Sequence, residues 1–191
     1  EDSQTPQIAL PHAERLANTM PTVAHMVHMP AHIYIRTGKY QKSIEQNLRA
    51  IEAAEQFLKH WKIDSKAHLV SLPMSAKSSI AHADDFIWYA YLEQGNYKQS
   101  IKSANRIASR AGNKITNSLI AQGRYVLPIL TNRTFAKWDT ILASQRKNSE
   151  SQLINGLESF ARGTAYVNTD NLQKASAEFD KLKEILKHVT M

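Results

Sequence analysis

Apolar positions recur at helical spacing along the chain, and three segments repeat one arrangement of helix, turn and helix. In residues 34–44 and 91–101, a tyrosine is followed four places later by a glycine and two places after that by a second tyrosine. Residues 166–176 are a less regular copy, with Asp170 and Asn171 at the turn. A glycine or Asp-Asn pair ends one helix, and the following apolar residue begins the next. The pattern therefore predicts αα-hairpins.

We predict a single helical domain that covers residues 1–191. It contains a helix over 8–19, followed by about four hairpins. The third hairpin is degenerate, with its turn at Thr131–Thr134 between two apolar stretches. The predicted hairpins span residues 23–58, 80–111, 116–147 and 152–188. The second helices of the first two carry apolar stripes, formed by Ile44, Leu48, Ile51, Phe57 and Leu58, and by Ile101, Ala104, Ile107 and Ala108. One hairpin alone cannot bury such a stripe, so we expect the hairpins to stack into an all-α superhelix.

The segment from His28 to Tyr34 reads His, Met, Pro, a small residue, His, Ile and an aromatic residue, followed by Arg36 and Gly38. This pattern resembles a signature of a largely uncharacterised bacterial family of tetratricopeptide-repeat proteins, and residues 82–95 resemble a second signature. Residues 123–130 and 157–166 are similar to later parts, so the resemblance covers most of the chain from His12. It implies an α-α superhelix and no assigned reaction. Family members are longer at the N-terminus, so we expect this chain to be a C-terminal portion.

The spacing of the repeats departs from a regular array. Gly95 follows Gly38 by 57 residues, whereas a tetratricopeptide unit takes about 34. We therefore predict an insertion over residues 59–79. Because this segment is rich in apolar residues, we expect it to lengthen the preceding helix and fold over the array.

In tetratricopeptide arrays, the first helix of each hairpin lines a concave groove through its second, fifth, ninth and thirteenth places. Counted back from Gly38 and from Gly95, these places hold His25, His28, His32 and Arg36, and then His82, Asp85, Tyr89 and Glu93. On a helix, each set falls within about 80° of arc. The equivalent places of the later hairpins are mostly apolar. We therefore predict a polar ligand-binding pocket in the first half of the array.

The predicted pocket fits three interpretations. His28 and His32 at i and i+4, with His82 and Asp85 at i and i+3, could hold a zinc-type divalent metal ion. Arg36 could instead clamp an anion or a peptide carboxylate. In the third interpretation, His32, His82 and Asp85 form hydrogen bonds between helices and bind no ligand. All three depend on Pro30, because a proline inside a helix can separate His25 and His28 from His32.

The composition narrows the function classes. The net charge of +7 is spread along the chain without basic runs interleaved with aromatic residues, which argues against nucleic-acid binding. The chain has no cysteine, no glycine-rich phosphate loop and no stretch of apolar residues long enough for a membrane span. No motif predicts an enzyme. We predict a scaffold that binds a protein or peptide and requires no cofactor, with metal binding or metal-dependent hydrolysis as the alternative; the sequence assigns neither compartment nor oligomeric state.

Overall fold

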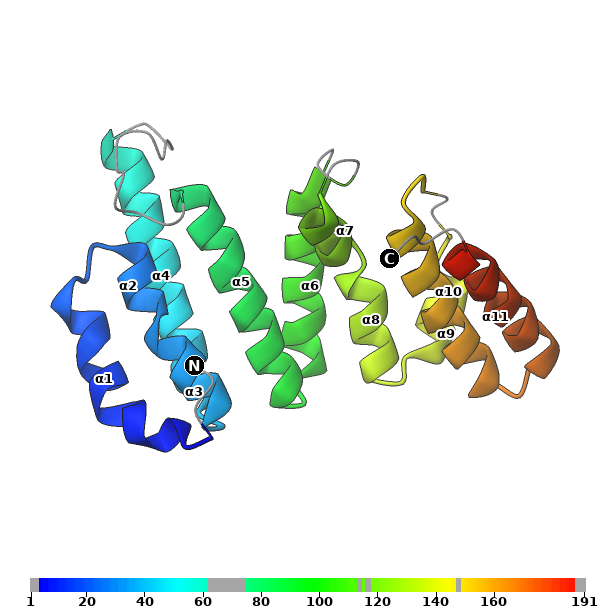
Figure 1. Ribbon diagram of the computed structural model, residues 1–191, viewed down its shortest axis with the longest axis horizontal. Coiled ribbons are helices and arrows are strands. Elements are labelled where there is room, and N and C mark those ends of the chain that lie inside the picture. Colours follow the sequence, from blue (N-terminus) through cyan, green and yellow to red (C-terminus); the bar gives the residue numbers. More distant parts are fainter. Residues whose placement is uncertain (1–3, 62–74, 113–114, 116–117, 147–148, 188–191) are drawn as a thin grey trace. The chain divides into compact units, whose positions relative to one another are not determined.

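The computed structural model describes residues 4–61, 75–112, 115, 118–146 and 149–187 (Figure 1). Across these ranges the chain forms helices and no strand, so the all-helical prediction is confirmed. Contacts divide the chain into two compact units, Glu1–Asn96 and Tyr97–Met191. The boundary falls in the turn of the predicted hairpin 80–111, which therefore has one helix in each unit. Most of the predicted insertion, residues 62–74, lies outside the described residues.

Within its described residues, the first unit has a short 3-10 helix followed by five α-helices. They are η1 (Pro6–Ala9), α1 (Leu10–Thr19), α2 (Ala24–His28), α3 (Pro30–Arg36), α4 (Tyr40–Trp61) and α5 (Ala76–Glu93). The long helix α4 packs against α2 and α3 and also against α5. Helix α4 therefore joins the three helices that carry the predicted pocket residues. None of the described helices of the chain is long and apolar enough to cross a lipid bilayer.

The core of the first unit is built largely from small side chains. On α4 the buried residues are Ser43, Ile44, Asn47, Ala50 and Ala54, and α5 adds Ala83, Ile87 and Ala90. The predicted stripe on α4 is wrong at Leu48, which is 51% exposed. Small residues at a helix contact allow closer axes, and the face of α4 that they form excludes the larger Leu48 from the core.

One turn geometry occurs at four places in the described part of the chain. A residue with positive φ ends a helix at Gly38 (φ 70°), Gly95 (69°), Ala136 (52°) and Asp170 (54°). In each turn the next residue donates its backbone N–H to a carbonyl five residues earlier, which is the hydrogen bond of a Schellman motif. These bonds are Lys39 to Tyr34 (2.8 Å), Asn96 to Tyr91 (3.0 Å), Lys137 to Asn132 (2.8 Å) and Asn171 to Tyr166 (2.9 Å).

The left-handed position of this turn gives a matched pair of stability predictions. A Cβ atom at Gly38 would meet nothing within 4 Å, so Gly38→Ala acts through the backbone alone. We expect it to lower the free energy of unfolding by about 1 kcal/mol, because L-residues are strained at positive φ. Ala136→Gly should raise the free energy of unfolding by about 0.5 kcal/mol. The gain is smaller than the strain that is relieved, because glycine has more conformational entropy to lose on folding. Urea denaturation followed by circular dichroism measures both; changes of the same sign would contradict the strain argument.

In the residues that the structure describes, the second unit contains six helices. They are α6 (Tyr97–Ala111), α7 (Leu119–Tyr125), α8 (Leu127–Thr134), α9 (Trp138–Ala143), α10 (Gln152–Val167) and α11 (Leu172–Lys187). The break between α7 and α8 falls at Val126, two residues before Pro128, which lies in the first turn of α8. The predicted turn at Thr131–Thr134 is wrong, because α8 continues through Thr134 and the chain turns at Ala136. Figure 1 shows α10, drawn in orange, beside α11, whose colour runs from orange to red.

A buried carboxylate links α11 to the rest of the second unit. Glu178 accepts hydrogen bonds from Arg146 and from Lys181, the latter at 2.9 Å, and its side chain is 8% exposed. Burial acts to raise the pKa of Glu178. The hydrogen bond from Lys181 and the charges of Arg146 and Lys181 outweigh this effect and hold the pKa below its ordinary value of 4.5. Glu178 therefore contributes stability in its ionised form.

Acid should weaken the second unit through Glu178. Because its pKa is lower in the folded than in the unfolded chain, its contribution is complete above pH 4.5 and is lost as the pH falls through the folded pKa. Glu178→Gln should be less stable than wild type at pH 7 and lose less stability below pH 4.5. Urea denaturation at pH 7 and at pH 3 measures this difference. Glu184→Gln, on the exposed side of α11, is the control and should keep the wild-type pH dependence.

Candidate metal centre

Pro30 divides the predicted histidine-bearing helix without dispersing its histidines. Helix α2 ends at His28 and α3 begins at Pro30, but Met29 between them keeps helical angles (φ −50°, ψ −38°). The N–H of Met29 still bonds to the carbonyl of His25 at 3.0 Å, and the N–H of His32 bonds to the carbonyl of Met29 at 3.2 Å. His28 and His32 therefore remain one turn apart on one side of a nearly continuous helix.

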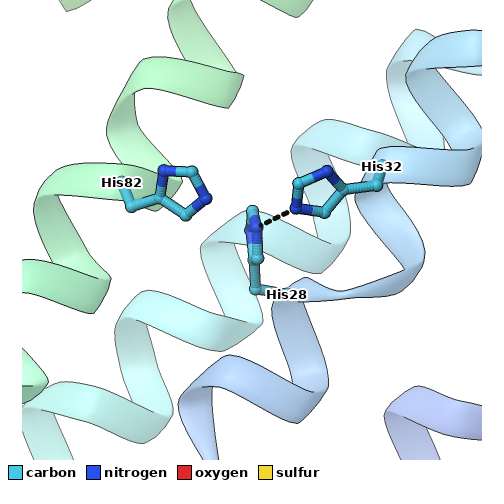
Figure 2. Close-up of side chains that lie close together, drawn as sticks. All are labelled: His28, His32 and His82. Carbon is cyan, nitrogen blue, oxygen red and sulfur yellow. Dashed lines mark hydrogen bonds between the residues drawn. The ribbon is translucent and has the colours of Figure 1, made fainter. Parts of the chain in front are cut away.

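Three imidazoles converge in the first unit. The Nε2 atoms of His28 and His32 are 2.9 Å apart, and one nitrogen from each of His28, His32 and His82 lies within 4.8 Å of the others. Figure 2 shows the rings of His28 and His32 directed toward one another, with His82 of α5 beside them. We call these three residues the histidine cluster. Four nitrogens around zinc at about 2.05 Å would be about 3.3 Å apart, so side-chain shifts of about 1–1.5 Å would bring the cluster to that geometry.

The protonation of His28 is set by Asn47 of α4. Asn47 is fully buried, and its Nδ2 donates to the Ser43 carbonyl at 2.8 Å. This bond orients the amide so that Oδ1 faces His28 Nδ1 at 2.7 Å. The only hydrogen between that pair is the one on Nδ1 of His28, so the Nε2 atom carries a lone pair. Such a second hydrogen bond is what orients a metal-binding histidine in proteins.

Burial keeps His28 neutral. His28 is 2% exposed, and desolvation lowers its pKa to about 3, against the hydrogen bond that His28 donates to Asn47, which acts to raise the pKa. The charges that His82, His32 and His25 acquire on protonation lower it further. The Nε2 lone pair of His28 is therefore available at neutral pH. In the metal-free protein it accepts the hydrogen bond across the 2.9 Å contact with His32.

Phe86 closes one side of the histidine cluster. Its ring centroid lies 4.6 Å from those of His28 and His32 and 5.1 Å from that of His82. Phe86 is four residues after His82 on α5, and residues at i and i+4 lie nearly above one another on a helix. The position next to the cluster is therefore apolar.

Asp85, the predicted fourth metal ligand, is not part of the histidine cluster. It follows His82 by three residues on α5, and Phe86 takes the place beside His82 instead. The neighbouring Asp84 is buried, but a residue two places from His82 lies about 200° around the helix from it. Carboxylates of α5 therefore do not complete the set of nitrogen ligands.

The other predicted pocket residues lie outside the cluster. His25 stacks on His28 at 6.0 Å between ring centroids, and its buried Nδ1 atom has no hydrogen-bond partner within the described part of the chain. Arg36 is exposed. Tyr89 and Glu93 form a separate exposed group near the C-terminal end of α5, where Tyr40 donates to Glu93 at 3.4 Å. The eight predicted residues therefore do not form one pocket.

In the exposed group of Tyr89 and Glu93, the carboxylate lies close enough to affect the tyrosine. Tyr89 is 39% exposed, and partial burial together with the carboxylate of Glu93 raises its pKa. Tyr89 follows His82 by seven residues, which is about 10 Å along a helix. This exposed group thus differs in character from the histidine cluster, in which His28 is buried and His32 and His82 are partly buried.

Two residues of the site escaped the sequence analysis. Asn47 lies on the buried face of α4 beside Ile44, and a polar residue on such a face was the available signal. Phe86 gave no signal beyond its spacing from His82. No protein-family model and no curated protein matches the sequence. The chemistry of the histidine cluster is therefore the basis for assigning a function.

Proposed function

We propose that this protein binds one divalent transition-metal ion through His28, His32 and His82, with zinc as the best fit. The observation that carries the proposal is the convergence of three imidazole nitrogens within 4.8 Å, one of them held in the metal-binding tautomer by Asn47. Three imidazoles that meet at one point are a donor set that zinc accepts in proteins.

The donor set selects the class of ion. Three neutral imidazoles suit zinc, copper, nickel and cobalt, whereas magnesium and calcium take oxygen ligands. Zinc accepts tetrahedral coordination with three histidines and one further ligand. Ligands come from two consecutive short helices and from α5, so an ion would connect elements that are distant in the sequence.

The scaffold that we propose is tetratricopeptide-like, as the sequence resemblance implies. It is supported by the fourfold recurrence of one Schellman turn and by the helix that follows each turn after one residue. The alternative of a protein or peptide ligand is supported by the exposed group of Tyr89, Glu93 and Tyr40. Metal binding has the stronger support, because the histidine cluster is more buried and its geometry is more specific.

Elemental analysis tests the metal site. Purified protein is loaded with zinc, desalted and analysed, and we expect about one zinc per chain. His82→Ala should retain less than a tenth of this amount, because two imidazoles remain. His25→Ala is the matched control: it removes a neighbouring histidine outside the ligand set and should keep the full content. Equal zinc in wild type and His82→Ala, with both folded by circular dichroism, would refute the site.

A further inference from the structure

We infer that the metal ion in the histidine cluster keeps an exchangeable fourth position that takes a small monoanion, and that Phe86 limits the size of this ligand. The inference rests on the proposed metal site and goes beyond it by naming a ligand class. It depends on the charge of the ligands, on the exposure of the three histidines and on the position of one aromatic ring.

The charge of the ligand set favours an anion. All three ligands are neutral imidazoles, and Asp85 lies outside the set. A divalent ion bound by them therefore keeps its two positive charges, unlike an ion bound by thiolates or carboxylates. Because the site is partly removed from water, an anionic fourth ligand gains more electrostatic energy there than in bulk solvent.

The exposure of the three histidines differs and gives the site an open side. His28 is 2% exposed and is enclosed by its bond to Asn47. His32 and His82 are both only partly buried, so solvent reaches the cluster from the side that these two residues form. A ligand can therefore enter and leave without unfolding of the helices.

Phe86 restricts the space around the ion. Its ring centroid lies 4.6–5.1 Å from those of all three histidines, so it sits over the cluster rather than beside one member. An aromatic ring at this distance fills the volume that a bulky ligand would need. The fourth position should therefore accept thiocyanate or acetate and exclude benzoate.

Cobalt(II) is the probe, because its visible absorption reports coordination number and the exchange of ligands. Wild-type protein loaded with one Co²⁺ is titrated with thiocyanate, acetate and benzoate. We expect saturable spectral changes with the first two, at one anion per cobalt, and at least tenfold weaker binding of benzoate than of acetate. Phe86→Ala should bind benzoate at least tenfold more tightly than wild type. Phe86→Leu, which keeps most of the volume, should stay close to wild type.

The outcomes separate the two proposals. If the protein binds no cobalt, the proposed metal site itself fails. If it binds one cobalt but no anion changes the spectrum, the fourth position is closed and the inference is wrong while the metal site stands. If benzoate binds wild type as well as acetate does, or if Phe86→Ala leaves benzoate binding unchanged, Phe86 does not set the size limit.

Discussion

Zinc is expected to raise the free energy of local unfolding of the first unit by about 4 kcal/mol when free zinc is a thousandfold above its dissociation constant. An ion bound by the histidine cluster would hold α2 and α3 to α5, so opening of any of these helices would release it. Hydrogen exchange followed by mass spectrometry measures the effect helix by helix. Peptides from α2, α3 and α5 should exchange up to about a thousandfold more slowly with zinc than with a chelator.

The control for this prediction is His32→Ala. It removes one ligand from the partly exposed side of the histidine cluster and should abolish the zinc-dependent protection. Peptides from α10 and α11, which belong to the second unit, provide an internal reference. Protection by zinc that persists in His32→Ala would show that the ion binds elsewhere.

Replacement of Asn47 by leucine should weaken zinc binding about 10–100-fold, although Asn47 is not a ligand. Leucine has a similar volume but cannot accept the hydrogen bond from His28 Nδ1. The proton is then free to move to Nε2, where it would compete with the metal. The buried Nδ1 atom also loses its partner, which should cost the metal-free protein about 1–3 kcal/mol of stability.

Competition with a chromophoric chelator measures the zinc affinity of Asn47→Leu. Gln46→Leu is the matched control, because it makes the same kind of change on the adjacent residue of α4, where Gln46 accepts a hydrogen bond from Arg49 on the exposed surface. It should bind zinc as wild type does. Wild-type affinity in a folded Asn47→Leu variant would mean that Asn47 does not orient the ligand.

The helical turns differ in how clearly the local sequence predicts them. Gly38 and Gly95 marked two of the four turns, because positive φ favours glycine and the following tyrosine begins a helix. Asp170 and Asn171 marked another turn less clearly. Ala136 has the same backbone geometry without the glycine, so the sequence misplaced that turn at Thr131–Thr134. The conformation there is imposed by the packing of the second unit, which a local pattern does not contain.

The sequence likewise predicts some residues of the histidine site and misses others. His28 and His32 were paired by helix periodicity, which Pro30 interrupts without changing their register. His82 joined them through the repeat alignment. Asn47 could not be found from helical spacing, because it contacts His28 from a different helix and the two residues are 19 positions apart in the sequence. The spacing of i and i+3 predicts Asp85 beside His82 in the ligand set, whereas the structure places the i+4 residue Phe86 at the cluster.

The sequence also predicts only partly which residues of α4 are buried and which are exposed. Ile44 and Leu48 look equivalent on a helical stripe, yet Ile44 is 1% exposed and Leu48 is 51% exposed. The contact face of α4 follows its small residues, Ser43, Ala50 and Ala54, and includes Asn47. The hydrophobic stripe therefore predicts the buried face of α4 only approximately. Its exact position depends on the close packing of α2, α3 and α5 against α4.

X-ray absorption at the zinc edge tests the central claim most directly. For the zinc-loaded wild-type protein, we expect three imidazole nitrogens at about 2.0–2.1 Å and one further oxygen or nitrogen ligand that completes four-coordination. His82→Ala should lose one imidazole contribution or the bound zinc. A wild-type spectrum dominated by oxygen ligands, or one that is unchanged by His82→Ala, would contradict a metal centre formed by His28, His32 and His82.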